Sequence, residues 1–352
     1  MRVTLNQIAE AAGVSRGTVD RALNHRGRIN PEVAERILRI AKEMGYRRNL
    51  AGRALAMAGK DLRIGVLVQA AGTPFIQKVI EGIKEARTQV REFGFEVVIK
   101  TIPNIDSEQA LAALRELSAE GCSGIALMPS EEPEFVGLVN SLAGQGIPIV
   151  TFNSDLENSG RQCFVGQDSM QSGKVAAGLM GQILAPASRV LVISGHPDFA
   201  SHRNRTKGFT DELSRIRGDL NILPVQYAMD DEAKAEEIAY QVLQDRFGRA
   251  GNENVETVEN IGIYLSAAGL DGVTKAVRRA EASGSVKVIS NDLTDDNIRL
   301  IRNGEAEFLI GQDPHTQGYE PVMILFRQLF ENRPARMDPL FTEITIKTRY
   351  NV

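Results

Sequence analysis

The most constraining feature of this sequence is an alternation of short apolar runs with longer amphipathic stretches between residues 62 and 331. A continuous apolar run at 63–68 is followed by apolar positions at helical spacing over 76–90, and the next apolar run spans 95–101. Strands that are apolar on both faces and alternate with helices are typical of parallel sheets covered by helices. The pattern therefore predicts an α/β body.

The alternation continues along the chain and contains more units than one sheet needs. Further strands are predicted at 124–128, 147–152, 189–193, 221–226, 261–265, 286–289 and 307–310, and further helices at 107–120, 132–144, 169–184, 203–216, 231–247, 269–282, 294–303 and 316–331. We therefore expect two parallel α/β lobes. In such sheets ligands bind beyond the carboxyl ends of the strands.

The charge of the chain is distributed unevenly. The first 60 residues carry 12 Lys or Arg and 5 Asp or Glu, whereas the remaining 292 carry 29 basic and 40 acidic residues. A basic head on an acidic body is typical of a nucleic-acid binder with a separate regulatory or catalytic module. The alternative is a merely solvated basic tail, which the helical pattern of the head disfavours.

Three short helices are predicted in the head, and the second spans about 16–23. Their starts and stops are marked by Thr4, Gln7, Gly13, Ser15, Asn30, Pro31 and Gly45. These residues provide a capping box, further caps and glycine stops. Two helices joined by a tight glycine turn, with a third behind them, predict a helix-turn-helix DNA-binding domain.

The outward face of the second helix predicts the DNA contacts. If Val19, Ala22 and Leu23 form the small core, Arg16 lies in the first turn, where it could donate two hydrogen bonds to a guanine. Five candidates offer hydroxyl, amide or imidazole groups suited to phosphate contacts, namely Thr4, Ser15, Thr18, Asn24 and His25, whereas Gly17 allows close approach and Asp20 could accept from a cytosine or pair with Arg16. The predicted DNA-binding residues of the first two helices are Thr4, Ser15, Arg16, Gly17, Thr18, Asp20, Arg21, Asn24 and His25. Any one of them alone also fits a solvated helix face.

Residues 3–56 resemble the DNA-binding head of the lactose repressor family (LacI/GalR). The signature is T-x-x-x-[IV]-A-x-x-A-G-V-S-x-x-T-V-S-R-x-[LI]-N, and this chain departs from it at Asp20, where the family has Ser. The resemblance implies a DNA-binding domain over 1–48, a hinge helix and linker over 49–60, and an effector domain over 61–352. It also implies that Leu55 inserts into the minor groove. A plain linker is the alternative for the hinge.

Polar side chains follow many of the predicted strands. They occur at 72–75, 153–155, 291–292 and 312–313, at Ser266, and in the segment 194–205 with His202, Arg203 and Arg205. Planar polar groups beside one phenylalanine ring suit a sugar or polyol, whose hydroxyls both donate and accept hydrogen bonds. Capping of strand ends is the alternative for each of them.

Residues 62–331 also resemble the type I periplasmic binding fold, and ribose-binding proteins in particular. This second resemblance implies a two-lobed effector domain that closes on a small sugar. The effector contacts that it implies are Thr73, Phe75, Asn153, Ser154, Arg203, Asn291, Asp292 and Gln312.

The sequence lacks the residue patterns that catalysis, metal binding or insertion into a membrane would need. The two cysteines and four histidines form no metal-binding spacing, so neither a metal nor a cofactor is expected. Ser194, His196 and Asp198 lie close in sequence but without the G-x-S-x-G elbow of a hydrolase. No apolar run reaches about 18 residues. The basic, polar N-terminus does not resemble a secretion signal, which predicts a cytoplasmic protein.

These features favour a transcriptional regulator of carbohydrate-utilisation genes that acts as a repressor and is not an enzyme. We expect a homodimer that binds a palindromic DNA operator and responds to a small sugar or polyol. Two alternatives remain open: a solute-binding protein of a sugar transporter, and an enzyme with an accessory DNA-binding head. The effector's identity, and whether it acts as inducer or corepressor, are left open by the sequence.

Overall fold

The computed structural model describes residues 3–23, 29–46, 62–247, 260–331, 333 and 335–352. The predicted hinge at 49–60, with Leu55, lies outside the described residues, as do Asn24 and His25.

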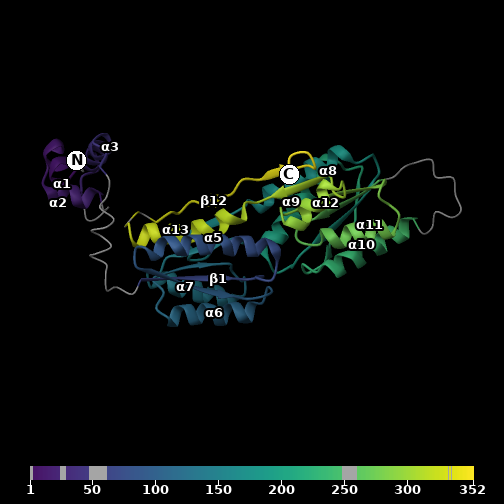
Figure 1. Cartoon of the computed structure of the whole chain (residues 1–352), viewed down its shortest axis with the longest axis horizontal. Coiled ribbons are helices and arrows are strands. Elements are labelled where there is room, and N and C mark those ends of the chain that lie inside the picture. The colour runs from purple at the N-terminus through teal and green to yellow at the C-terminus, as the bar shows by residue number, and fades with distance from the viewer. Residues whose placement is uncertain (1–2, 24–28, 47–61, 248–259, 332, 334) are drawn as a thin grey trace.

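The head has the predicted three helices, α1 (Leu5–Ala12), α2 (Arg16–Leu23) and α3 (Pro31–Glu43) (Figure 1). The capping box of α1 is present, because the Gln7 backbone N–H donates to Thr4 Oγ1 and the Thr4 backbone N–H donates to Gln7 Oε1. Each helix contributes one fully buried β-branched side chain to the small core, namely Ile8, Val19 and Ile37. The predicted inward face of the second helix is therefore confirmed.

The first lobe of the body is a sheet with helices on both faces. Its strands are β1 (Leu62–Val68), β2 (Phe95–Thr101), β3 (Gly124–Leu127), β4 (Ile149–Phe152), β5 (Cys163–Gly166) and β12 (Leu340–Phe341), in the order β12-β5-β4-β3-β1-β2. All neighbouring pairs are parallel. Figure 1 shows α5 (Pro74–Arg91) and α13 (Pro314–Leu329) on one face, and α6 (Ser107–Ala119) and α7 (Pro133–Gly144) on the other.

The second lobe repeats this plan. Its strands are β6 (Arg189–Ser194), β7 (Asn221–Ile222), β8 (Gln226–Tyr227), β9 (Ile261–Leu265), β10 (Val286–Asn291), β11 (Phe308–Gly311) and β13 (Thr345–Lys347). The sheet order is β13-β11-β10-β9-β6-β7, with β8 also paired to β6 and only β13 antiparallel. Its helices are α8 (Ser169–Ile183), α9 (Ala200–Ile216), α10 (Glu232–Phe247), α11 (Leu270–Arg279) and α12 (Asp295–Arg302). The predicted fold class, a three-helix head and a body of two parallel α/β lobes, is confirmed.

The chain passes between the lobes three times. It leaves the first lobe after β5, returns after β11 through α13, and ends with β12 in the first sheet and β13 in the second. In both lobes the strand order reverses beside the first strand, β1 or β6, which places the ligand crevice at the loops that follow these strands and their neighbours.

The structure corrects one predicted strand. The segment 221–226 is not continuous but forms the two short strands β7 and β8. Pro224 stands between them, and a proline has no backbone N–H to donate to the sheet. None of the helices within the described ranges is both long enough and apolar enough to cross a membrane.

Backbone contact through glycines fixes how α8 and α9 pack. A Cβ atom at Gly173 would lie 2.1 Å from the backbone oxygen of Arg205, and one at Gly208 would lie 2.2 Å from that of Met170. The two helices therefore approach more closely than any side chain allows. This packing sets the position of the Arg205 backbone, which matters for the cavity described below.

We predict that Gly173→Ala lowers the free energy of unfolding by about 1–3 kcal/mol, because the new methyl group separates α8 from α9. Gly178→Ala is the matched control in the same helix, since a Cβ there meets nothing within 4 Å. It should raise stability by up to about 1 kcal/mol through helix propensity alone. Urea unfolding followed by circular dichroism measures both changes. Equal effects of the two substitutions would contradict the packing argument.

Candidate functional site

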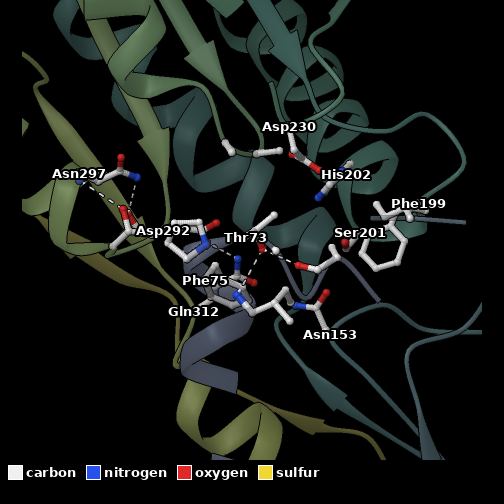
Figure 2. A pocket seen from close by; sticks show the side chains of 18 of the residues that line it. Thr73, Phe75, Asn153, Phe199, Ser201, His202, Asp230, Asp292, Asn297 and Gln312 are labelled. Carbon is white, nitrogen blue, oxygen red and sulfur yellow. Dashed lines mark hydrogen bonds between the residues drawn. The ribbon is translucent and has the colours of Figure 1, made fainter. Parts of the chain in front are cut away.

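A cavity of about 320 Å³ lies between the two lobes at the carboxyl ends of their strands. Its lining from the first lobe includes Thr73, Phe75, Met128 and Asn153, and its lining from the second includes Phe199, Ser201, His202, Arg205, Asp230, Asp292 and Asn297, with Gln312 between the lobes. Figure 2 shows these side chains gathered around one space. The cavity thus lies where the strand order predicts a ligand site.

Several residues at the cavity have a backbone conformation that side chains rarely adopt. Positive φ angles occur at Ala70 (53°), Asn153 (63°), Asp230 (59°) and Asp292 (74°), each shortly after a strand. All four line the cavity. Such strained residues cluster at ligand sites, because the surrounding structure must hold them in place. Here three of these turns bring the polar side chains of Asn153, Asp230 and Asp292 into one space.

The centre of the site is a buried chain of three side chains. Gln312 Oε1 accepts a hydrogen bond of 3.1 Å from the Arg205 guanidinium, and Gln312 Nε2 donates to Asp292 Oδ1. Arg205 also donates to the backbone oxygen of Ser266, while its Nε has no partner among the described residues. Burial raises the pKa of the Asp292 carboxyl, and the nearby Arg205 charge opposes that rise. Asp292 is a half-buried carboxylate in the cavity lining, which favours a ligand that donates hydrogen bonds.

Gln312 also joins this chain to the segments that cross between the lobes. Its backbone oxygen accepts hydrogen bonds from Gln317 Nε2 at 2.6 Å and from Thr342 Oγ1 at 2.9 Å. On a second crossing, Gln167 Nε2 donates to the backbone oxygen of Gly311 at 2.9 Å. A ligand that contacts Asp292 or Arg205 therefore lies one side chain away from these crossings, which we call the interlobe hinge.

His202 and Asp230 form the opposite side of the cavity (Figure 2). The backbone N–H of His196 donates to His202 Nδ1 at 3.0 Å, so the proton of the neutral ring is on Nε2. Burial lowers the pKa of His202 to about 4, and the ring is therefore uncharged at neutral pH. This wall offers one neutral donor beside one carboxylate acceptor.

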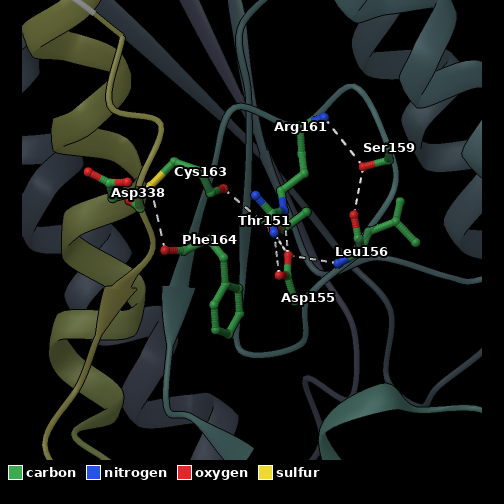
Figure 3. A network of polar contacts seen from close by, with 8 residues as sticks. All are labelled: Thr151, Asp155, Leu156, Ser159, Arg161, Cys163, Phe164 and Asp338. Carbon is green, nitrogen blue, oxygen red and sulfur yellow. Dashed lines mark hydrogen bonds and ion pairs between the residues drawn. The ribbon is translucent and has the colours of Figure 1, made fainter.

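The loop that carries Asn153 is held in shape by an ion pair rather than by a ligand. Figure 3 shows Thr151, Leu156 and Arg161 converging on Asp155. Two nitrogens of Arg161 donate to the two Asp155 oxygens at 2.6 Å each, and Thr151 Oγ1 donates at 2.8 Å. Asn153 itself donates to Gln317 Oε1 at 3.0 Å. Asp155 is therefore a positioning residue, which explains why it follows the strand end without lining the cavity.

Of the effector contacts predicted from the sequence, the structure places five in the cavity lining, namely Thr73, Phe75, Asn153, Asp292 and Gln312. Ser154, Arg203 and Asn291 are not in the lining. Ser154 Oγ accepts the Ser201 backbone N–H at 3.2 Å and so caps α9 across the lobes. Asn291 points into its own sheet, where Nδ2 donates to Tyr264 and to the backbone oxygen of Leu265.

Arg203 lies at the rim instead of the interior. Its guanidinium contacts both carboxylate oxygens of Glu131 in the first lobe at 2.8 Å. A second ion pair, between Lys78 of the first lobe and Asp295 of the second, also measures 2.8 Å. Exposed pairs of this kind contribute about 0–1 kcal/mol each. Both bridge the lobes, so they favour the closed arrangement slightly without contacting a ligand.

The main residue that the sequence prediction passed over is Arg205, although it belongs to the segment singled out for its basic residues. Ser201, Arg205 and Phe209 follow one another at four-residue spacing and are all buried on one face of α9. Arg203 lies off that face and is exposed. The apolar Phe209 could have identified the inward face from sequence alone. No comparable signal pointed to Asp230, which enters the cavity because of its positive φ.

The exposed face of α2 is the candidate nucleic-acid interface. Arg16, Gly17 and Arg21 are exposed, while Thr18 and Asp20 are half-buried. Arg21 Nε donates to the Gly17 backbone oxygen at 3.2 Å. The remaining predicted contacts lie at helix starts: Thr4 caps α1, and Ser15 Oγ accepts the Thr18 backbone N–H at 3.1 Å. These groups remain predictions as DNA contacts.

No group of three or more metal-binding side chains occurs in the part of the chain that the structure describes. Ser194 of the short Ser-His-Asp segment has its hydroxyl held by Thr206 and Ser266, at 3.0 and 3.1 Å, and not by His196.

Two family models match the chain. Residues 64–332 match the periplasmic binding protein domain, and residues 4–49 match the bacterial regulatory proteins of the lacI family. The ribose operon repressor of Lactococcus lactis is 28% identical over 256 residues, which cover 72% of this chain and 71% of that protein. The ribose import binding protein RbsB of Bacillus subtilis is 21% identical over 259 residues, which cover 74% and 79%. An ABC transporter solute binding protein from Burkholderia graminis, solved in complex with D-arabinose, has the same fold as the body of this chain, with a TM-score of 0.73. The two sequences are 22% identical, and the match covers 83% of this chain and 96% of that one.

We predict a pH-dependent loss of stability that originates at His202. Its pKa is about 4 in the folded protein and 6.5 as the ordinary value, so between these pH values the unfolded chain binds more protons. Stability should therefore fall as the pH decreases from 6.5 to 4, by at most about 1.4 kcal/mol per pH unit for this group.

The measurement is urea unfolding of the wild type and of His202→Gln at pH 7 and pH 5. The variant should lose less stability between the two pH values. His315→Gln is the control, because this ring is exposed and lies beside Glu85 at the surface. A His202→Gln variant with the same pH dependence as the wild type would remove His202 from this account.

Proposed function

The chain belongs to the periplasmic binding protein domain family, carries a lacI-family DNA-binding head and is a sugar-responsive transcriptional regulator, and we propose that it is a repressor of carbohydrate-utilisation genes. The observation that carries this proposal is the Arg205–Gln312–Asp292 chain, which joins the cavity to the interlobe hinge. The similarity to the ribose operon repressor of Lactococcus lactis supports repression.

In this proposal two chains form a homodimer and bind a palindromic operator, with one head in each half-site. Arg16 reads a base from the first turn of α2, and the hydroxyls of Thr4, Ser15 and Thr18 contact phosphates. The segment 49–60 is the hinge between the head (1–48) and the effector domain (61–352), and Leu55 inserts into the minor groove. The exposure of Arg16 and Gly17 supports this arrangement.

The effector is a small sugar or polyol that binds in the interlobe cavity. Asp292, Asp230 and Asn153 offer acceptors, while Arg205 and His202 offer donors, and this mixture matches hydroxyl groups. Phe75 and Phe199 supply apolar surface for the face of a sugar ring. Thr73 and Gln312 complete the contacts, and Arg205 takes the role that the sequence prediction gave to Arg203.

Control of DNA binding follows from a difference in effector affinity between two arrangements of the lobes. The effector bridges residues of both lobes, so it stabilises the closed arrangement. The two interlobe ion pairs add to closure whether or not the effector is present. The linker enters the first lobe directly before β1, so a rotation of the second lobe reaches the linker through the crossings between the lobes or through the second chain of the homodimer.

The head also distinguishes this function from the alternatives. A transporter's solute-binding protein has no use for a helix-turn-helix domain, and DNA is found in the cytoplasm, where we place this protein. Binding without catalysis fits the cavity, in which Gln312 joins the Arg205 guanidinium to the Asp292 carboxylate by hydrogen bonds. We therefore assign no enzymatic reaction and no cofactor.

We predict that Arg16→Ala weakens specific DNA binding by roughly 5- to 100-fold, the range for one bidentate contact to a base. The probe is duplex DNA from upstream of the chain's own gene, measured by gel shift against random competitor. Arg215→Ala, which removes an exposed cation of the effector domain, should leave the affinity unchanged. Binding that is insensitive to both Arg16→Ala and Leu55→Ala would contradict the docking model.

We also predict that Asp292→Asn abolishes the effector response and leaves basal DNA binding intact, because only the cavity loses an acceptor. A thermal-shift screen of pentoses, hexoses, inositols and their phosphates identifies a ligand, since ligand at 100 times its Kd stabilises the protein by about 2.7 kcal/mol. Arg203→Ala is the control and should retain the response with a few-fold weaker affinity, as for an exposed ion pair. A full response in Asp292→Asn would remove the cavity assignment.

A further inference from the structure

A second cavity, of about 450 Å³, adjoins the first at the edge of the cleft. We call it the mouth cavity, and it is lined by Ala70, Gly72, Thr73, Pro103, Asn104, Ile105, His196, Met229 and Asp230. Five of these residues, namely Ala70, Gly72, Thr73, Ile105 and Asp230, also line the inner cavity. The two cavities therefore lie side by side and share a wall in each lobe.

The mouth cavity lies at the part of the rim where the lobes are not joined. Elsewhere the rim is bridged by the Lys78–Asp295 and Glu131–Arg203 ion pairs. Among the described residues, no hydrogen bond or ion pair links 103–105 of the first lobe to His196, Met229 or Asp230 of the second. With the other contacts formed, this opening remains, so a ligand in the inner cavity could extend through it.

Both walls of the opening are held in fixed positions. In the first lobe, the backbone N–H groups of Ala70 and Gly72 donate to the backbone oxygens of Asn104 and Pro103 at 3.0 Å each. In the second lobe, Met229 and Asp230 have consecutive positive φ angles of 58° and 59°. The Asp231 backbone N–H donates to the Ala228 oxygen at 3.1 Å and closes this turn. This turn, which places Met229 in the mouth cavity and Asp230 in the wall that both cavities share, has a fixed conformation and is not a loose loop.

The surface of the mouth cavity suits a sugar ring. Met229 is 44% exposed although it is a large apolar residue, and it faces the same space as Pro103 and Ile105. Polar groups of Asn104, His196 and Asp230 surround these apolar side chains. His196 Nδ1 accepts the Asp198 backbone N–H at 3.3 Å, which leaves its Nε2 as a donor. Apolar contact on one ring face with polar groups at the edge is the chemistry by which proteins hold pyranoses.

We infer that the effector is a disaccharide whose first ring occupies the inner cavity and whose second ring occupies the mouth cavity, against Met229. This inference rests on the proposed function, because it extends the same effector site. A second ring in the mouth cavity distinguishes this chain from a receptor that closes completely around one monosaccharide. Glycosides with a non-sugar substituent share the first ring but lack the hydroxyls that Asn104 and His196 would bind.

The test compares each disaccharide with its component monosaccharide by isothermal titration calorimetry on the full chain. The probes are maltose, cellobiose and melibiose against glucose and galactose, xylobiose against xylose, and the phenyl glucosides as a comparison. We expect one disaccharide to bind at least about tenfold more tightly than its monosaccharides, which is the effect of a few well-placed contacts. It should also bind more tightly than the phenyl glucosides.

Met229→Trp should fill the mouth cavity and remove this preference, leaving monosaccharide affinity within about twofold of wild type. Met337→Trp is the matched control, because Met337 is exposed but lies outside both cavities, and it should keep the preference. Thermal unfolding of both variants checks that they are folded.

The inference is overturned if no disaccharide binds more tightly than its components, if a phenyl glucoside equals the best disaccharide, or if Met229→Trp leaves the preference intact. Failure of the proposed function gives a different result. In that case no carbohydrate of either kind binds and Asp292→Asn has no effect, whereas a chain that binds only monosaccharides through Asp292 contradicts this inference alone.

Discussion

The hydrogen bonds of one residue, Gln312, connect the cavity to the interlobe hinge. A carboxamide has one accepting end and one donating end, and here the first faces the Arg205 guanidinium and the second faces the Asp292 carboxylate. Neither charged group could exchange places with the other, so the order of cation, amide and carboxylate fixes the orientation of the side chain. Because the backbone of Gln312 lies on a crossing between the lobes, the same residue belongs to both the cavity and the hinge.

The cost of burial explains why this arrangement responds to a ligand. Arg205 is 2% exposed and Gln312 is 4% exposed, so their polar atoms have little contact with water. A buried polar group without a partner costs about 1–3 kcal/mol. Arg205 Nε lacks a partner among the described residues, and burial raises the pKa of the Asp292 carboxyl because it removes water from the charged form. Hydroxyl groups of a ligand would satisfy Asp292, and closure of the lobes is favoured by that gain.

Sequence patterns predicted the head and most of the body because both depend on local rules. Caps such as Thr4 and Asn30 act within one turn, and long buried strands such as β1 leave continuous apolar runs. The short strands β5, β12 and β13 were not predicted, because two to four residues leave little pattern unless apolar neighbours extend the run. The return of α13 to the first lobe, where it packs on α5, depends on contacts between residues more than 200 positions apart, which periodicity does not record. Likewise, Arg203 and Arg205 differ only in which face of α9 they occupy.

The order of the chain limits how the cavity can act on the head. The linker joins the body at the start of β1, and the head therefore has a direct covalent connection to the first lobe alone. Rotation of the second lobe reaches the linker either through the three crossings or through a second chain that contacts both lobes. The crossings are short and are joined by hydrogen bonds of Gln167, Gln312 and Thr342. They are therefore suited to act as the axis of a rotation between the lobes and not to transmit that rotation to the linker. In the homodimer that we propose, rotation of the two second lobes would change the separation of the two first lobes and of the heads attached to them.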